Sequence, residues 1–448
     1  MGDSPWLGQD RGHARSERPK APRASVGGSL DYESAFASPE IGPNGIYLFE
    51  LEAQPGGPEG RSDTTAGSKP IRCLERPQSA PALRSCHFVL VGTNAWFHSG
   101  NTLSRTRYLS HIPVSAQSAT LLSSFIPGTT VQTGAVLEVQ NNVTVAEPLA
   151  LNGSGIGGAG ALRSISGSNI WNGTLEYNTA SIGVDSGALT INGQISGSSP
   201  LRKVGGGTLV FAGENAYQGQ TLVDQGVFNI RHNNALGTTA QGTTVAGGAT
   251  LEVQGNITVG EALTLNGLGA ADAGALRSRS GDNVWNGNVT LNTARIGVDA
   301  DSTLTVNGQM SGSGVFSKIG AGTIILTAEN AYTGETQIRA GALQLAGGPN
   351  RLNTAGNMRI EGGTFDLNGQ NQILNKLILA GGGRVELNNG ATLTVNSGDF
   401  WPYSGVVITG SGRLVKIGTG FITFGATTAT YTGGTYIEQG TLHLYGGN

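Results

Sequence analysis

A stretch of about thirty residues occurs three times in this chain, and its apolar pattern restricts the fold more than any other feature. The copies are Leu201 to Ile230, Phe316 to Leu345 and Leu414 to Leu444. Early in each copy, residues that stay apolar alternate with residues whose type varies. The fixed pairs are Leu209 and Phe211, Ile324 and Leu326, and Ile422 and Phe424. A period of two predicts a β-strand with one buried face.

Two further strands follow the same rule in each copy. The second keeps a β-branched residue beside a charge whose sign varies, in the pairs Val223 and Asp224, Ile338 and Arg339, and Ile437 and Glu438. Charges that vary in this way are expected to face water. The third strand follows a corner glycine that permits a positive φ. Its glycine and two buried residues are Gly226, Phe228 and Ile230; Gly341, Leu343 and Leu345; and Gly440, Leu442 and Leu444.

The composition supports a fold of many short strands. The 448 residues include 73 Gly, 38% hydrophobic residues and 13% charged residues. Collagen would need Gly at every third position, and a disordered chain would contain fewer β-branched and aliphatic residues. The net charge is −3 and the repeats contain no cluster of Lys and Arg, so neither a nucleic-acid groove nor an anionic-membrane patch is expected. No stretch has the roughly eighteen apolar residues of a membrane helix.

The thirty-residue motif belongs to a longer repeat. Residues 128–140 are nearly matched by residues 242–254. Shorter matches follow at the same offset, between Gly160 to Arg163 and Gly274 to Arg277, Asn169 to Gly173 and Asn283 to Gly287, and Ile182 to Asp185 and Ile296 to Asp299. The unit is a tandem duplication of about 115 residues, and a shorter third unit begins near Asn350. We therefore expect units at about 128–241, 242–349 and 350–448.

Short strands, glycine corners and a long-range repeat together predict an all-β solenoid, with a right-handed parallel β-helix as the favoured form. In such a helix each coil of roughly 20 to 30 residues stacks about 4.8 Å from the previous one, and equivalent apolar residues form interior ladders. Each long unit would then hold about four or five coils. A β-propeller needs a motif about every 40 to 50 residues, which these widely spaced motifs do not provide.

The first 115 residues differ from the rest of the chain. They are rich in Arg, Pro, Ser and Gly and lack both periodicities, so we expect residues 1–115 to be largely disordered and residues 116–448 to form the solenoid. Both cysteines, Cys73 and Cys86, lie in this segment, and they are equally compatible with one disulfide and with two free thiols. The first ten residues show no signal peptide, and Trp6 breaks the myristoylation pattern.

The thirty-residue copies resemble the autotransporter-associated β-strand repeat of bacterial secreted proteins. That repeat runs from a Lys through Gly-x-Gly-Thr-Leu and an apolar strand to Asn-x-Tyr-Thr-Gly-Gly-Thr and a closing Gly-Thr-Leu. The first two copies match it at Lys203 to Leu209, Asn215 to Tyr217, Gly219 to Thr221, Lys318 to Ile324, Asn330 to Gly334 and Gly341 to Leu343. The third keeps Tyr431 to Thr435 and Gly440 to Leu442, but Thr428 and its neighbours replace the usual Asn.

The resemblance implies an elongated β-helical passenger that is exported and displayed outside the cell or at the outer membrane. It also implies a signal peptide and a C-terminal transporter barrel, and the sequence shows neither. We therefore expect an incomplete or misannotated gene product. An open solenoid end after Leu444 predicts aggregation or missing sequence, because an uncapped edge pairs with other chains.

Four groups of residues are candidates for binding, and each has a structural alternative. Asp299 and Asp301 could supply oxygen ligands to calcium, but the Gly and Glu of an EF-hand loop are absent, so a surface turn is favoured. Trp171 and Trp285 are either sugar-stacking platforms or, as we favour, covers over a corner of the core. The other two groups are expected to be structural; they are the loop-packing Tyr217, Tyr332 and Tyr431, and Asn152 and Asn266, which suit left-handed turns or stacked amide ladders.

No enzymatic site is expected. A polysaccharide lyase or glycoside hydrolase on this architecture needs carboxylates gathered on one face, whereas Asp185 and Asp299 repeat between units as a structural turn does. The repeats offer only His232 and His443, at unrelated positions, which argues against a Ser-His-Asp set. Catalytic, cofactor-binding and metal-binding residues are therefore all predicted to be none, and an unrecognised glycan-processing site is the alternative.

The sequence thus predicts a non-enzymatic, secreted or cell-surface stalk with a structural or adhesive role. Its mechanism would be geometrical, because stacked coils satisfy backbone hydrogen bonds and present a long, low-charge Thr/Asn/Gly surface for weak multivalent contact. The expected partners are surface glycans or other cell-surface proteins, together with end-to-end self-association. Neither nucleic acid nor a cofactor is expected.

Overall fold

The computed structural model describes residues 111–114, 128–400, 405–425 and 427–445. These residues form 37 β-strands and three short 3-10 helices. The segment expected to be disordered, its cysteines and its boundary at residue 115 lie outside the described residues, with one exception. Strand β1 (His111–Val114) lies inside that segment and pairs in parallel with β3 (Val136–Gln140).

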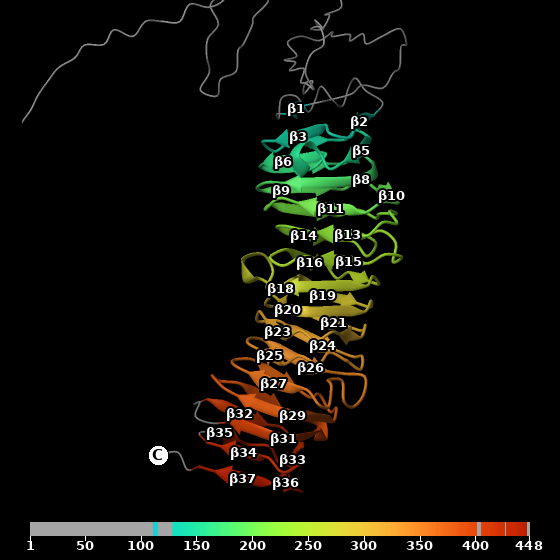
Figure 1. The fold of residues 1–448 in the computed structure, drawn as a ribbon. Coiled ribbons are helices and arrows are strands. Elements are labelled where there is room, and N and C mark those ends of the chain that lie inside the picture. Colours follow the sequence, from blue (N-terminus) through green and yellow to red (C-terminus); the bar gives the residue numbers. More distant parts are fainter. Residues whose placement is uncertain (1–110, 115–127, 401–404, 426, 446–448) are drawn as a thin grey trace, which may run out of the picture. The chain divides into compact units, whose positions relative to one another are not determined.

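The strands wind into a parallel β-solenoid of about 15 coils, which stack in sequence order (Figure 1). Each coil has three faces, which we call A, B and C in the order in which the chain reaches them from Thr129. Within a face, most strands pair in parallel with the strands of the coils before and after them. The predicted parallel β-solenoid is therefore confirmed.

Most strands belong to a single face. Face A holds β2 (Thr129–Val131), β5 (Leu149–Gly153), β10 (Ile195–Gly197), β17 (Thr258–Val259), β21 (Ser302–Val306), β24 (Thr323–Leu326), β26 (Ala342–Leu345), β28 (Thr364–Asp366), β30 (Arg384–Glu386), β32 (Val406–Thr409) and β35 (Thr427–Ala429). Face B holds β1, β3, β6 (Leu162–Ser166), β11 (Leu201–Val204), β13 (Thr221–Val223), β15 (Thr243–Val245), β18 (Leu263–Gly267), β22 (Met310–Ser311), β33 (Arg413–Lys416) and β36 (Thr435–Ile437). Face C holds β4 (Thr144–Val145), β7 (Ser168–Trp171), β9 (Ala188–Ile191), β12 (Thr208–Phe211), β14 (Val227–Ile230), β16 (Thr250–Gln254), β23 (Phe316–Ile319), β25 (Thr336–Ile338), β27 (Asn357–Ile360), β34 (Phe421–Phe424) and β37 (Thr441–Leu444).

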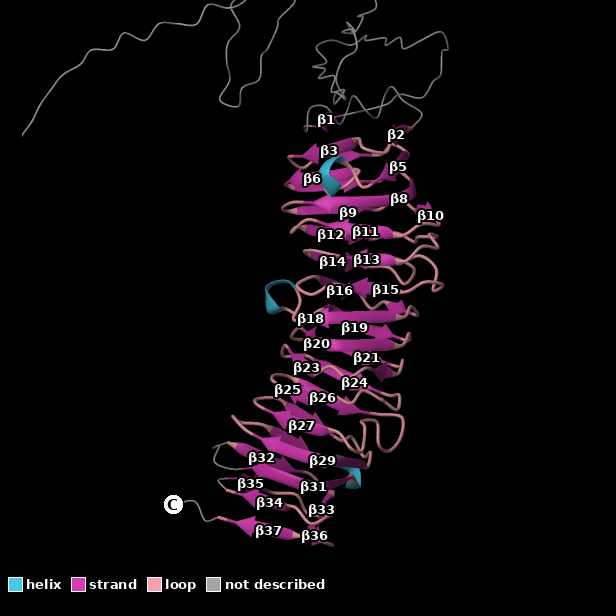
Figure 2. Cartoon of the chain, in the orientation of Figure 1, coloured by secondary structure: helices cyan, strands magenta, loops and turns pink. Residues whose placement is uncertain are grey.

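Five longer strands turn a corner and contribute to two faces each. They are β8 (Leu175–Val184), β19 (Leu276–Trp285), β20 (Val289–Val298), β29 (Gln372–Leu379) and β31 (Thr392–Phe400). Among the described residues, helix is confined to the corner loops, at η1 (Ile156–Gly158), η2 (Ala270–Asp272) and η3 (Asn388–Gly390) (Figure 2).

The inward side chains of successive coils stack into one apolar core. The period-two prediction is confirmed, because both fixed apolar residues of the first strand are buried in all three motif copies. Each corner glycine has the expected positive φ, at 65° for Gly226, 64° for Gly341 and 82° for Gly440. The charges predicted to face water are half-buried or exposed at Asp224, Arg339 and Glu438.

The last described coil departs from this pattern. Ile437 and Leu444, whose equivalents in the first two copies are buried, are 52% and 73% exposed. Leu442 packs against the core but is only partly buried. These side chains have a neighbouring coil on one side only among the described residues, so an inward-facing position does not by itself bury them.

The long repeat does not contain a whole number of coils. Strand β2 lies on face A, whereas its equivalent in the second unit, β15, continues the face B ladder of β11 and β13. Likewise β7 lies on face C, but the equivalent end of β19 pairs with β17 and β21 on face A. The unit therefore advances by about five coils plus one face, and equivalent residues of the two units point in directions one third of a turn apart. The corresponding loops at η1 and η2 accordingly emerge on different sides (Figure 2).

Tight stacking at the corners yields a stability prediction. A Cβ added at Gly308 would lie 1.8 Å from the carbonyl oxygen of Gly287 in the previous coil, whereas a Cβ at Gly247 would meet nothing within 4 Å. We expect Gly308→Ala to destabilise the solenoid by ~1–3 kcal/mol through overpacking. Gly247→Ala should be neutral or slightly stabilising. Urea denaturation followed by circular dichroism measures both, and equal midpoints for the two variants would contradict the corner packing.

Candidate functional site

The thirty-residue motif buries a lysine in every copy. Lys203, Lys318 and Lys416 are each at most 1% exposed, because they share the inward side of their strands with an apolar residue two positions earlier. The Nζ of Lys203 donates hydrogen bonds to the carbonyl oxygens of Val204, Gly205 and Gln225 at 3.0, 2.6 and 3.0 Å. The first two acceptors lie at the corner of its own coil and the third lies in the next. The lysine thus joins two coils and uses all three of its donors.

The same arrangement recurs in the other two copies. The Nζ of Lys318 donates to the carbonyls of Ile319, Gly320 and Ala340 at 2.8, 2.8 and 3.1 Å. In the third copy Lys416 donates in the same way, and its acceptors are Ile417, Gly418 and Gln439. Burial lowers the pKa of Lys203 and of Lys318 to about 8, and it also lowers the pKa of Lys416.

An asparagine in each of the first two copies joins coils at a second corner. The side chain of Asn215 accepts a hydrogen bond from the Ile195 amide in the coil before and donates to the Ala235 carbonyl in the coil after. Asn330 likewise accepts from the Met310 amide and donates to the Arg351 carbonyl. The third copy has no Asn at this place. The motif therefore acts across three successive coils.

The motif tyrosines pack the loop, as predicted. Tyr217 and Tyr332 are buried, and their hydroxyls lie 2.7 and 2.6 Å from the hydroxyls of Thr221 and Thr336, four residues later. Tyr431 makes the same contact with Thr435. Burial raises the pKa of Tyr217 and of Tyr332.

The two repeated aspartates belong to ion-pair ladders on the outer surface. Arg163 bridges Glu138 at 3.0 Å and Asp185 at 2.6 Å, and these three residues come from three successive coils. In the second unit Arg277 bridges Glu252 and Asp299 at 3.1 and 2.7 Å. The hydrogen bond with the aspartate raises the pKa of each guanidinium. Because each aspartate is held by an arginine in both units, the structural interpretation of this pair is supported.

The tryptophans do not form a sugar platform. Trp171 and Trp285 are 1% and 0% exposed, so the favoured alternative, that they cover a corner of the core, is correct. Trp171 donates from Nε1 to the carbonyl oxygen of Glu147 at 2.9 Å. A ring buried to this extent has no free face for a ligand.

The asparagines of the Leu-Asn-Gly runs form amide ladders. Asn152 donates to the carbonyl oxygen of Val131 at 3.1 Å, and Asn266 donates to that of Val245 at 2.7 Å. Each also accepts from the asparagine of the next coil, Asn178 or Asn292. The ladder alternative is confirmed and the left-handed alternative is wrong, because the positive φ falls on the glycine that follows each asparagine.

The remaining sequence candidates do not come together. Asp301 lies in a turn with a φ of 58°, and Asp299 is engaged by Arg277, which agrees with the predicted surface turn. His232 accepts a hydrogen bond from the amide of Asn234, whereas His443 stacks on Phe421 in the last coil. No group of three or more His, Cys, Asp or Glu side chains within the described ranges is arranged to hold a metal ion. Nor do those ranges include a helix with the length and hydropathy needed to cross a bilayer.

Sequence reasoning missed a buried carboxyl group in each long unit. Glu147 and Glu261 are both 3% exposed at an inward corner position. The hydroxyl of Thr243 lies 3.1 Å from Oε1 of Glu261, and Thr129 holds Glu147 in the same way. In both residues Oε2 has no hydrogen-bond partner among the described residues. Burial raises the pKa of Glu261 to about 8 and also raises that of Glu147, so Glu261 is largely protonated at neutral pH.

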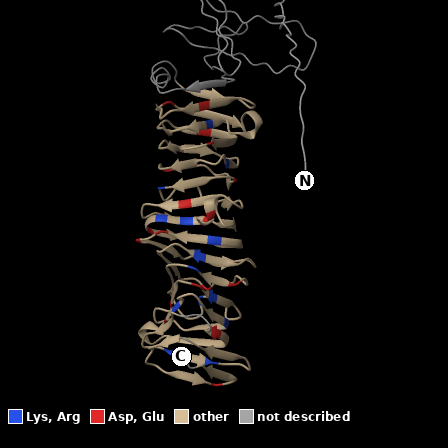
Figure 3. Cartoon of the chain, turned by 90° about the vertical axis from the view of Figure 1, so that its left-hand side faces the viewer, with Lys and Arg blue, Asp and Glu red and all other residues tan. Residues whose placement is uncertain are grey.

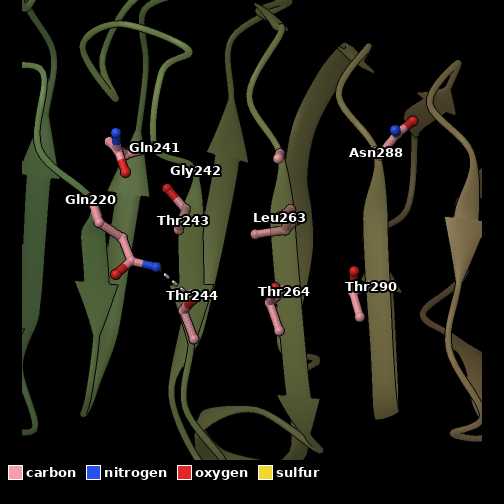
Figure 4. Close-up of a pocket in the computed structure, with 10 residues that line it drawn as sticks. Gln220, Gln241, Gly242, Thr243, Thr244, Leu263, Thr264, Asn288 and Thr290 are labelled. Carbon is pink, nitrogen blue, oxygen red and sulfur yellow. Dashed lines mark hydrogen bonds between the residues drawn. The ribbon is translucent and has the colours of Figure 1, made fainter.

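A shallow hollow lies on the outer surface near Thr243 in the second unit and near Thr129 in the first. The hollow of the second unit has a volume of about 110 Å³ and lies on face B; its lining residues are Gln220, Gln241, Gly242, Thr243, Thr244, Ala262, Leu263, Thr264, Asn288 and Thr290 (Figure 4). The hollow of the first unit has a volume of about 360 Å³ and lies on face A; its lining residues are Gly128, Thr129, Thr130, Pro148, Leu149, Ala150, Thr174, Leu175, Glu176 and Ser196. Eight lining positions of the second hollow are the equivalents of lining positions in the first.

The stacked coils and the hydrogen bonds of the buried Lys and Asn side chains define the class of protein. It is a parallel β-solenoid whose repeats bond each coil to its neighbours. The model of the passenger-associated-transport-repeat family matches residues 201–230, 316–345 and 414–444. These are the three motif copies, so the resemblance to an autotransporter passenger repeat is confirmed.

One relative extends the comparison beyond the motif copies. The chain is 30% identical over 367 residues to the protein named Adhesin BmaC autotransporter from Brucella suis biovar 1 (strain 1330). That match covers 60% of this chain and 10% of the relative, so the chain spans about a tenth of the relative's length. No solved structure matches the chain significantly.

The buried lysines predict a distinct pH dependence. Lys318 has a pKa of about 8 in the folded chain against an ordinary value of 10.5, so between these values the unfolded chain binds a proton that the folded chain does not. The unfolding free energy should therefore rise with pH in that window, by up to about 1.4 kcal/mol per pH unit for each such lysine. Lys318→Met should reduce this slope, and it should also lower stability at pH 7, where three carbonyls lose their donor. Lys376→Met, at an exposed lysine of β29, is the control in urea titrations at several pH values; an unchanged slope in Lys318→Met would refute the assignment.

The buried carboxyl predicts the opposite trend at lower pH. Glu261 is protonated in the folded chain and ionised in the unfolded chain between pH 4.5 and about 8, so its contribution to stability falls as the pH rises through this range. Glu261→Gln removes that loss. We expect the variant to match the wild type near pH 5 and to exceed its urea midpoint at pH 8, whereas Glu214→Gln, at an exposed glutamate, should follow the wild type. If Glu261→Gln also parallels the wild type across this range, the buried acid is not protonated.

Proposed function

We propose that this chain serves as a non-enzymatic passenger displayed at the cell surface, with a structural or adhesive role. The observation that carries the proposal is that the motif residues make their hydrogen bonds inside the solenoid. Lys203 and Asn215 point inward and join one coil to the next, and Tyr217 packs the loop within its own coil. Because the motif residues make their contacts inside the solenoid, they favour the function of a stalk. Its outer surface is free to vary and to make contacts.

The outer surface suits weak, repeated contacts. Charged residues are sparse on the ribbon and lie singly or in small groups (Figure 3). The larger groups are the ion-pair ladders around Arg163 and Arg277, where opposite charges compensate each other. Between them lie rows of Thr, Asn and Gln, which offer neutral hydrogen-bonding groups at the coil spacing of about 4.8 Å. Many such contacts add up through multivalency although each is weak.

The relative supports the adhesive role. Its name is that of an adhesin and an autotransporter, and this chain aligns with a tenth of it. Export and surface display of this chain are proposed on the same ground. The alternative function, a glycan-processing enzyme, would use an unrepeated group of acids on one face, and no specific observation favours it.

The proposal is tested with beads that carry the full 448-residue chain. We expect these beads to adhere to cells more strongly than uncoated beads, and we expect heat-unfolded protein on the same beads to lose the effect, because the contacts need the stacked faces. Polysaccharides incubated with the soluble chain should show no new reducing ends and no unsaturated products. Cleavage products would identify an enzyme, and equal adhesion by folded, unfolded and uncoated beads would refute the adhesive role.

A further inference from the structure

We propose that the hollow of each tandem unit binds a neutral glycan, and that one chain thereby bridges two glycan strands held on different faces. The proposal rests on the adhesive function proposed above and names its ligand class and its sites. The two sites are defined as site 1, the face A hollow lined by Thr129 and Ala150, and site 2, the face B hollow lined by Thr243 and Thr264.

The two hollows arise from the same repeated feature. Each is lined by a glycine, Gly128 or Gly242, that lies against the corner residue of the following coil, Pro148 or Ala262. Gln220, in the coil before Gly242, also lines site 2. A hollow therefore recurs at matched positions of the two units.

The lining of site 2 identifies the ligand chemistry. Its polar side chains are hydroxyls and carboxamides, and none of its lining residues carries a charge. Site 1 has one charged lining residue, Glu176, at the position equivalent to Thr290. Figure 4 shows Thr244, Thr264 and Thr290 in one row on β15, β18 and β20, whose register pairs these residues directly. Their separation is set by the strand spacing of about 4.8 Å, which is close to the length of one sugar unit in an extended polysaccharide. Groups that donate and accept hydrogen bonds at that interval complement the hydroxyls of successive neutral sugars.

The offset of the repeat determines how the two sites act together. Because the unit advances by about five coils plus one face, site 1 opens on face A and site 2 on face B. A single straight glycan strand that lies along one face cannot fill both. Two strands can, and the chain then crosslinks them. A duplication with a whole number of coils would instead have placed both sites in one line, where they would grip one strand with higher avidity.

The test uses outward-facing substitutions that fill one hollow at a time. Ala150→Arg fills site 1 and Thr264→Arg fills site 2; both residues are half-buried and point away from the core. Thr305→Arg, on face A of β21 and outside both hollows, is the matched control. Each variant is made in the full chain and checked by circular dichroism. The probes are beads coated with neutral oligosaccharides of glucose, galactose or mannose, and, for comparison, beads coated with uronic-acid oligosaccharides.

We expect the wild type and Thr305→Arg to bind at least one neutral oligosaccharide with two equivalents per chain and to agglutinate its beads. Each single hollow variant should bind one equivalent and fail to agglutinate, and the double variant should not bind. Unchanged binding by the double variant, one equivalent for the wild type, or a preference for the acidic oligosaccharide would overturn the proposal. Cell adhesion measured in parallel separates the two claims, because equal adhesion by the wild type and the double variant would refute the glycan sites alone. Absence of adhesion by the wild type would refute the proposed function itself.

Discussion

The fold depends on satisfying the backbone at the corners of each coil. Along the faces, most parallel strands pair with the coils on both sides, which gives their amides and carbonyls hydrogen-bond partners. At the corners this ladder stops, and carbonyl groups turn toward an apolar interior where an unpaired oxygen is costly. The lysines of the motif answer this constraint, because one ammonium group satisfies three corner carbonyls from two coils, as Lys318 does for Ile319, Gly320 and Ala340. Asn215 and Asn330 each pair one backbone amide and one backbone carbonyl through the two ends of the carboxamide.

Much of this architecture follows from the sequence, since alternation and corners are local properties. Leu209 and Phe211 are buried because a strand exposes alternate residues to the core, and the corner at Gly226 needs a positive φ whatever lies around it. The amide ladder through Asn152 was also accessible, as one of two alternatives, from its repetition at Asn266. The exposure of Leu444 was not, because burial of an inward residue depends on a neighbouring coil and not on its own strand.

The buried polar groups were harder to foresee because composition rules place charges at the surface. A signal was nevertheless present at Lys203, which lies two residues after the apolar Leu201 on one strand and so shares its side. The same spacing recurs in all three copies, and a lysine kept on the inward side of a strand needs carbonyl partners. Glu261 gave no comparable signal. It lies at a corner, where the period of two is interrupted and side-chain direction is set by the turn.

The hardest property to predict from the sequence is that a repeat unit does not contain a whole number of coils. Motif copies one and three begin on face B, with β11 and β33, whereas copy two begins on face C with β23. A rotation by one face leaves the core intact, because apolar residues from different places in the unit stack on one another, as Val223, Val245 and Leu265 do. The outer surface does change, because a rotation by one face moves every repeated outward residue to another face. Duplication in this solenoid therefore preserves the interior while it distributes copies of the surface around the axis.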